Sequence, residues 1–189
     1  MIFKRLFDYL LVLVVVIPIA IILFPVIAVL IRLTSPGPVI YWSKRVGKDN
    51  QLFDMPKFRT MRVDTPTVAT HLIDDPSSYL TPIGGFLRRS SLDEIPQIWS
   101  IISGNMSIVG PRPALFNQED LVQLRTECKV STLLPGLTGW AQVNGRDTVS
   151  VGEKVILDYF YMENWSLWLD LKIMVLTVSK IFRDDNVSH

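Results

Sequence analysis

The sequence has few of the residues that build disulfides and soft-metal sites. Its single cysteine, Cys128, excludes an internal disulfide and a metal site built from cysteines. The two histidines, His71 and His189, lie far apart in the sequence, and neither is assigned a role. The chain has no Walker A spacing, no dinucleotide fingerprint, no repeat and no low-complexity segment. Carboxylates and cationic side chains are therefore the main candidates for chemistry.

An excess of charge of either sign is also absent. The 19 Lys and Arg residues nearly balance the 18 Asp and Glu residues, which gives a formal net charge of +1. This balance gives no indication of a nucleic-acid partner. The mean hydropathy of +0.31 is high for a soluble protein. The length of 189 residues is enough for one domain with a core plus a membrane element.

Charge is missing altogether from residues 9–31, between Asp8 and Arg32. A straight helix of this length would reach about 34 Å, enough to cross a bilayer. The run is too long for the apolar part of a secretory signal, and no small-residue cleavage site follows it, so we expect it to be retained. A buried core helix is disfavoured, because such helices rarely stay uncharged for so long.

Pro18 and Pro25 interrupt this run, and each is expected to bend the helix because it removes a backbone hydrogen bond. Basic residues flank both ends, so the positive-inside rule does not choose an orientation for a spanning helix. A re-entrant helix, which bends and returns to the same face, keeps both basic ends cytoplasmic. The sequence therefore predicts a re-entrant membrane helix in residues 1–33 and a compact cytoplasmic-face domain in residues 34–189.

The remaining pattern predicts an α+β fold that is mainly helical. Short strands are expected at residues 39–42, 52–55 and 106–109. Helices are expected at residues 81–89, 93–104, 114–134, 150–163 and 166–182. The last two helices are amphipathic and carry aromatic residues suited to a lipid headgroup layer, which makes them candidates for interfacial helices. A packed core could use the same residues.

The acidic pair Asp93 and Glu94 begins a helix whose apolar residues lie on one face. Pro96 is tolerated only in a first turn, so the cap is expected near Asp93 and the end of the helix at Gly104. The pair would lie at the positive end of the helix dipole, with Arg88 a turn upstream. This place favours a bound phosphate, a metal-bridged anion, or both. Acidic residues in a first turn more often only cap a helix, so both interpretations stay open.

Cations occur at three further places. Lys57 and Arg59 alternate with apolar residues, as in a phosphate-binding strand or a basic edge near anionic headgroups. Arg112 stands between two prolines that limit its backbone, and a stiff arginine suits a diphosphate, although an ordinary turn would look the same. Arg146 lies in a glycine-rich segment, residues 135–147, where the backbone can come close to a ligand. This last signal is weak by itself.

Ordered motifs extend over nearly the whole chain. They lie at residues 4–8, 34–39, 45–47, 57–61, 91–97, 106–113, 135–146 and 164–172. Together they resemble the bacterial sugar transferases of the monotopic phosphoglycosyl transferase family, in its small form of a catalytic domain with a membrane anchor. Two departures occur. The family commonly bends its membrane helix at a Ser-Pro pair, whereas both prolines here follow apolar residues, and Asn105 stands where the family often has Asp.

The resemblance implies transfer of a phosphosugar from a nucleotide diphosphate sugar, usually UDP-linked, to a polyprenyl phosphate such as undecaprenyl phosphate, with release of UMP. It implies that Asp93 is the nucleophile, forms a covalent phosphosugar intermediate and contacts Mg²⁺, and that Glu94 assists. A covalent step lets UMP leave before the lipid enters. The positions that match phosphate-holding residues are Lys57, Arg88 and Arg112, with Arg59 and Arg146 as weaker matches.

The resemblance also places the chain at the bacterial inner membrane, as a monotopic protein with its catalytic domain on the cytoplasmic face. There it would catalyse the first membrane step of a surface glycan or glycoconjugate pathway such as O-antigen or capsule synthesis, and a homodimer is allowed. Two other classes are compatible with the residues: a membrane-bound phosphatase or pyrophosphatase that uses Asp93, and a non-catalytic membrane scaffold. No residue indicates which sugar is carried.

Overall fold

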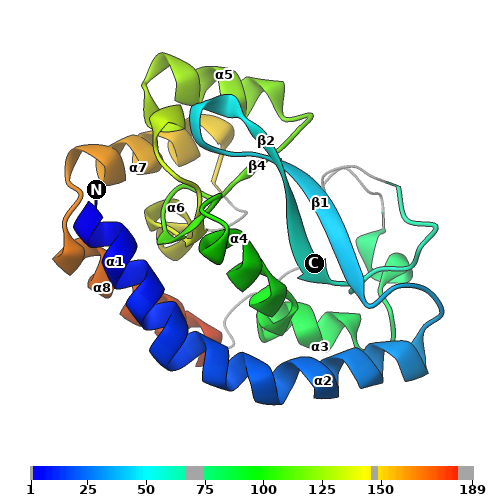
Figure 1. The fold of residues 1–189 in the computed structure, drawn as a ribbon. Coiled ribbons are helices and arrows are strands. Elements are labelled where there is room, and N and C mark those ends of the chain that lie inside the picture. The colour runs from blue at the N-terminus through cyan, green and yellow to red at the C-terminus, as the bar shows by residue number, and fades with distance from the viewer. Residues whose placement is uncertain (1, 67–74, 146–148, 183–189) are drawn as a thin grey trace.

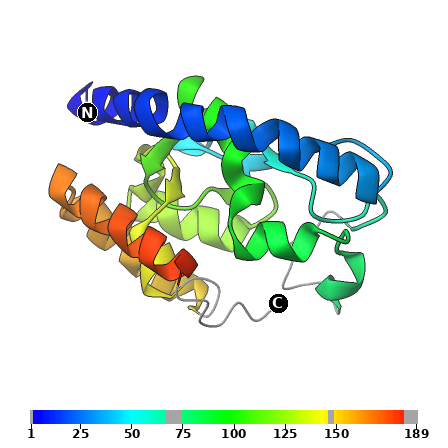
Figure 2. The ribbon, with the colours of Figure 1, turned by 90° about the horizontal axis from the view of Figure 1, so that it is seen from below.

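The computed structural model describes residues 2–66, 75–145 and 149–182. Most of these residues are helical, and short strands form two small sheets, so the predicted mainly helical α+β class is confirmed. A long apolar helix at the amino-terminal end runs along the edge of the molecule, and the rest of the chain packs mainly against one side of it (Figures 1 and 2).

The apolar helix consists of α1 (Ile2–Leu11) and α2 (Ile17–Thr34), joined by a π-helical segment at Val12–Val16. Figure 1 shows that the axis changes direction where α1 passes into α2. Pro18 lies in the first turn of α2, directly after the π-helical segment, whereas Pro25 lies inside α2. A π-helical turn is a common way to relieve a helix near a proline that cannot donate its hydrogen bond. The change of direction therefore lies next to Pro18.

One face of this helix belongs to the core and the other is exposed. Val12, Ile27 and Ile31 are almost fully buried, whereas most of the apolar surface of the helix faces outward. By length and composition, the helix from Ile2 to Thr34 is able to cross a membrane. A surface this apolar is rarely left in contact with water, so it points to a lipid or protein environment.

Both ends of the apolar helix are tied to the same folded unit. Near its start, the Lys4 ammonium donates to the buried Asp170 carboxylate at 2.6 Å. Just beyond its end, the Arg59 guanidinium donates to the carbonyl oxygens of Ser35 at 2.9 Å and Pro36 at 2.6 Å. The two ends of the helix are therefore held on the same domain.

The strands form one antiparallel and one parallel sheet. β1 (Ile40–Val46) and β2 (Leu52–Phe58) form an antiparallel hairpin, and β4 (Ala114–Leu115) pairs with the other edge of β1. β3 (Ser107–Val109) pairs in parallel with β5 (Gly136–Thr138). The hairpin strands continue beyond their predicted ends, which brings the end of β2 close to the acidic stretch.

The remaining helices follow the hairpin. They are α3 (Gly84–Arg89), α4 (Ile98–Ile102), α5 (Glu119–Glu127), α6 (Trp140–Asn144), α7 (Val151–Glu163) and α8 (Leu167–Phe182). Short 3-10 helices occupy Lys48–Asn50, Pro76–Tyr79, Leu92–Gln97 and Val130–Thr132. The helix cap predicted near Asp93 is observed at Ser91, two residues earlier. Ser91 precedes the helical turn in a left-handed conformation, with φ 56°, at the junction between α3 and the 3-10 helix at Leu92–Gln97.

Hydrophobic clusters join the apolar helix to the rest of the fold. The largest one is centred on Val12, Met55, Ile98, Ile101, Met106, Ile108, Val109, Val143, Tyr161 and Ile173. A second cluster contains Ile27, Ile31, Phe58 and Leu87, and a third lies between α5 and α7. The inner face of the apolar helix is thus part of two hydrophobic cores.

We expect Gly84→Ala to destabilise the protein by about 1–3 kcal/mol, as an overpacked core does. A Cβ at Gly84 would lie 2.1 Å from the carbonyl oxygen of Thr60, a backbone atom that cannot rotate away. Gly85→Ala is the matched control, because its Cβ would meet nothing closer than 3.4 Å. Thermal unfolding in detergent measures both variants. Equal midpoints for the two would contradict the close approach of α3 to the end of β2.

Candidate functional site

Two adjacent carboxylates, Asp93 and Glu94, lie in the 3-10 helix that joins α3 to α4. The left-handed Ser91 turns the chain so that this helix packs against β2. Asp93 is only 8% exposed, so this residue is buried and does not lie on an open surface. A charge in such a place needs a partner, because burial removes much of its hydration.

Cations from two other elements meet this carboxylate pair. Lys57, near the end of β2, places its ammonium 2.8 Å from Glu94 Oε1 and 3.8 Å from Asp93 Oδ2. Arg112, from the turn between β3 and β4, lies with Nη2 3.3 Å from the same Glu94 oxygen. Glu94 therefore takes the short ionic contacts, and Asp93 keeps a longer one.

The two carboxylates have pKa values shifted in opposite directions. Burial raises the pKa of Asp93, and the attraction of Lys57 and Arg112 only partly offsets this, while the neighbouring Glu94 charge raises it further. Burial also acts to raise the pKa of Glu94, but Lys57 and Arg112 outweigh it and lower that pKa to about 2. Glu94 is thus a permanent anion that holds two cations, and Asp93 is the less neutralised carboxylate of the pair.

Arg88 lies on the Asp93 side of the site. Its Nε donates to the Thr60 hydroxyl at 3.0 Å, which fixes the direction of the guanidinium. Burial lowers the pKa of Arg88, and the charge of Asp93 acts against that lowering. The structure therefore brings together Asp93, Glu94, Lys57, Arg88 and Arg112 from positions far apart in the sequence.

The two weaker candidates for phosphate binding, Arg59 and Arg146, are not part of this cluster as the structure describes it. The Arg59 guanidinium is buried and donates to the carbonyls of Ser35 and Pro36, so in this structure it closes the end of α2. Arg146 lies outside the described residues. Because the Arg59 guanidinium already donates hydrogen bonds to two backbone carbonyls, Arg59 is better explained as a structural residue than as a phosphate ligand.

Sequence reasoning gave no role to Arg45, although its motif was noticed. Arg45 lies in β1, where its Nη1 donates to the Pro113 carbonyl at 3.2 Å and its Nε donates to the Ser43 hydroxyl at 2.9 Å. Burial, with a smaller effect of the nearby Arg112 charge, lowers the pKa of Arg45 to about 10. The signal available in the sequence was the alternation of Ser43 and Arg45 on one face of a strand.

Mg²⁺ prefers carboxylate oxygens, and Asp93 is the carboxylate of this site that short ion pairs do not occupy. Among the described residues there is no group of three or more His, Cys, Asp or Glu side chains able to enclose a metal by themselves. Mg²⁺ is commonly held by only one or two carboxylates together with ligand phosphates and water. Because Glu94 is occupied by Lys57 and Arg112, Asp93 is the carboxylate better placed to contact the ion.

Comparison with known proteins identifies the family to which the chain is similar. A family model described as bacterial sugar transferase matches residues 1–184. The chain is 39% identical to the uncharacterized sugar transferase EpsL of Bacillus subtilis (strain 168), over 100% of this chain and 92% of EpsL. It is 44% identical to the UDP-glucose:undecaprenyl-phosphate glucose-1-phosphate transferase of Escherichia coli (strain K12), over 82% of this chain and 35% of that enzyme.

A second enzyme with the same name, from Xanthomonas campestris pv. campestris, is 40% identical over 82% of this chain and 34% of that enzyme. The chain thus spans nearly the whole length of EpsL but only 35% and 34% of the two named glucose-1-phosphate transferases. The similarity to these two enzymes concerns one part of each of them.

Proposed function

We propose that this chain, which belongs to the bacterial sugar transferase family, transfers a phosphosugar from a UDP-sugar to undecaprenyl phosphate and releases UMP. The observation that carries the proposal is the buried Asp93 carboxylate facing Lys57, Arg88 and Arg112. Such a cluster can hold a diphosphate next to a nucleophile. The E. coli and X. campestris relatives are named for a reaction of this kind, with glucose 1-phosphate as the transferred group.

The reaction proceeds in two displacements at the phosphorus that carries the sugar. An oxygen of Asp93 attacks this phosphorus, the bond to the bridging oxygen breaks, and UMP leaves with that oxygen. An oxygen of undecaprenyl phosphate then attacks the same phosphorus, and the bond to Asp93 breaks. The products are the undecaprenyl-diphospho-sugar and the regenerated carboxylate, so atoms and charges balance across the two steps.

Both steps bring an anion to an anion, and the cations of the site reduce that repulsion. Lys57, Arg88 and Arg112 bind the phosphate oxygens and keep the attacking carboxylate aligned. Lys57 and Arg112 lower the pKa of Glu94 to about 2, and the role of this carboxylate is to orient these two cations. Mg²⁺, when bound, supplies further neutralisation of the phosphate charge.

The proposal is tested with a panel of nucleotide sugars in the presence and absence of undecaprenyl phosphate, with UMP release as the readout. UDP-glucose is the first donor to try, because two relatives are named for it. We expect sustained UMP release only with the lipid acceptor. Release of inorganic phosphate without the acceptor would instead support a phosphatase that uses Asp93. A chain with no turnover, whose Asp93→Ala and Arg112→Ala variants cause no phenotype, would support the scaffold alternative.

We further propose that the apolar helix is re-entrant and holds the domain at the cytoplasmic face of the membrane. The helix is tied to the domain at its start by Lys4 and Asp170 and just after its end by Arg59. A helix that spanned the bilayer would have one end about 30 Å away, across the hydrocarbon region. Its exposed apolar face can instead enter one leaflet while both ends stay beside the domain.

This topology predicts that both ends of the helix are labelled from one side of the membrane. With Cys128 replaced by serine, Ile2→Cys and Leu33→Cys introduce thiols at positions 77% and 78% exposed. In sealed vesicles, an impermeant maleimide should reach both from the side that also labels a Gln123→Cys reporter on α5. Labelling of the two helix ends from opposite sides would exclude the re-entrant arrangement.

The pKa shifts predict how activity depends on pH. Asp93 must be ionised to attack, and its pKa is raised, so kcat/KM should fall on acidification at a pH above the usual carboxyl value of 3.8. Lys57→Met removes a cation that lowers this pKa and should move the acid limb to higher pH. Glu94→Gln removes an anion that raises it and should move the limb to lower pH. Shifts in the same direction for both variants would show that another group controls the limb.

A further inference from the structure

The backbone that carries Arg112 is held at three successive carbonyl oxygens. The Pro111 carbonyl accepts a hydrogen bond from a backbone amide of β5 at 2.9 Å. The Arg112 carbonyl accepts one from Nη1 of Arg125 at 2.8 Å, and the Pro113 carbonyl accepts one from Nη1 of Arg45 at 3.2 Å. Because the flanking prolines have fixed φ angles, these bonds leave the segment little freedom on either side of Arg112.

Arg125 is itself fixed by a buried ion pair between two helices. Its Nε and Nη2 both donate to Oδ2 of Asp158 on α7, at 3.0 and 2.6 Å. Arg125 is 8% exposed and Asp158 is 1% exposed. With Nε and Nη2 on Asp158 and Nη1 on the Arg112 carbonyl, the guanidinium links α5, α7 and the Arg112 segment. Buried ion pairs contribute little net stability, so the use of one here calls for another explanation.

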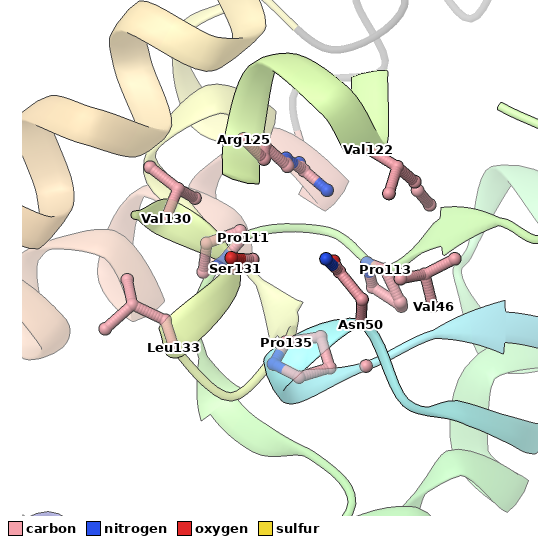
Figure 3. Close-up of a pocket in the computed structure, with 12 residues that line it drawn as sticks. Val46, Asn50, Pro111, Pro113, Val122, Arg125, Val130, Ser131, Leu133 and Pro135 are labelled. Atoms are coloured by element: carbon pink, nitrogen blue, oxygen red, sulfur yellow. The ribbon is translucent and has the colours of Figure 1, made fainter. Parts of the chain in front are cut away.

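The space beside Arg125 is not completely filled by side chains. Figure 3 shows Arg125 between α5 and the loop that bears Pro111 and Pro113. A cavity of about 30 Å³ lies beside them, lined also by Val122 and Ser131. Because side chains do not fill this space completely, the segment could move toward it if the guanidinium were removed. The hydrogen bonds therefore add to the packing of the buried Pro111 and Pro113 in fixing the backbone that carries the exposed Arg112 side chain.

We propose that Arg125, held by Asp158, is a positioning residue that aims Arg112 at the carboxylate site. The inference rests on the proposed phosphosugar transfer, in which Arg112 binds phosphate beside Glu94. Arg125 acts on the site through the Arg112 backbone, because each of its three nitrogens donates to Asp158 or to the Arg112 carbonyl. A guanidinium displaced by about 1 Å from its working position can cost a hundredfold in rate.

The test removes both charges of the pair together, in Arg125→Met/Asp158→Leu, so that no buried ion is left unpaired. Val122→Ala is the matched control, because it enlarges the same cavity from the same helix without touching a carbonyl of the segment. We expect the double variant to lower kcat/KM for the UDP-sugar by about 10- to 100-fold. In an Arg112→Ala background the same double change should lower it by less than about threefold, because there is no longer an arginine to aim.

Equal losses in the two backgrounds, or an equal loss in Val122→Ala, would overturn the positioning role and leave only a structural one. Hydrogen exchange of the peptide spanning residues 107–116 tests the same inference without using activity. It should quicken in Arg125→Met/Asp158→Leu and not in Val122→Ala. Unchanged exchange in a folded double variant overturns the inference even if transfer is confirmed. Faster exchange in a chain that shows no transfer would support the positioning and count against the proposed function.

Discussion

Asp93→Asn is expected to abolish UMP release, with a loss on the order of a thousandfold or more, while the protein remains folded. An amide has nearly the shape of the carboxylate but is a far weaker nucleophile, so the first displacement cannot occur. Folding should not suffer, because burial raises the pKa of Asp93 and the folded protein therefore disfavours its charge. Lys57 keeps its closer partner, Glu94, at 2.8 Å.

Intact mass spectrometry separates this chemistry from simple binding. After incubation with a UDP-sugar and no lipid acceptor, the wild-type chain should gain the mass of one phosphosugar, located on the peptide that contains Asp93. Asp93→Asn should gain nothing. An Asp93→Asn variant that keeps its turnover within tenfold of wild type, or a wild-type chain that turns over without any adduct, would exclude the covalent route.

Glu94→Gln provides the control, since it should lower stability more than Asp93→Asn does but should still allow the covalent adduct to form. Glu94 is stabilised as an anion by Lys57 and Arg112, so its loss leaves two cations facing one distant carboxylate. We expect a lower unfolding midpoint than in Asp93→Asn, and reduced activity with the adduct still formed. The two neighbouring carboxylates thus differ in role, because their environments differ while their residue type is nearly the same.

Local signals in the sequence were sufficient to predict several helices. The helix predicted at residues 150–163 is confirmed as α7, which begins with a capping box between Ser150 and Glu153. α8 agrees closely with the prediction for residues 166–182. In both cases the periodicity of apolar residues is a property of the segment itself. No contact with a distant residue is needed to recognise it.

The glycine-rich segment shows where such reasoning ends. It folds into β5 and α6, and a Cβ at Gly136 would lie 2.1 Å from the backbone nitrogen of Gly110. The requirement for glycine there comes from the backbone of Gly110, which directly follows β3 and lies 26 positions away in the chain. Arg59 and Arg45 are a similar case. Arg45 lies in β1 and Arg59 directly follows β2, and only the fold shows that Arg59 holds the carbonyls after α2 while Arg45 holds the Pro113 carbonyl.

Asp170→Leu is expected to destabilise the protein by about 3–5 kcal/mol, as loss of one partner of a buried ion pair does. The Asp170 carboxylate is 1% exposed and accepts from Lys4 at 2.6 Å, Tyr161 at 2.7 Å and Trp165 at 3.2 Å. Leucine would remove the acceptor that these three donors share, and the Lys4 ammonium would lose its ion-pair partner, whereas the Tyr161 hydroxyl would keep the Val109 carbonyl at 3.2 Å. Burial and the Asp170 charge raise the pKa of the Tyr161 phenol, so it remains a donor throughout the working pH range.

The same change should loosen the start of the apolar helix, because Lys4 is its link to α8. Chemical unfolding in detergent measures the loss, and Lys4→Met/Asp170→Leu is the decisive comparison. The double variant should be more stable than Asp170→Leu alone, since it no longer buries an unpaired ammonium. Any loss of UMP release in Asp170→Leu should then be partly restored in the double variant, because Asp170 supports the fold and takes no part in the chemistry. If the double variant is no more stable and no more active than Asp170→Leu, the loss comes from the donors Tyr161 and Trp165. The contact between Lys4 and Asp170 would then not be what anchors the apolar helix.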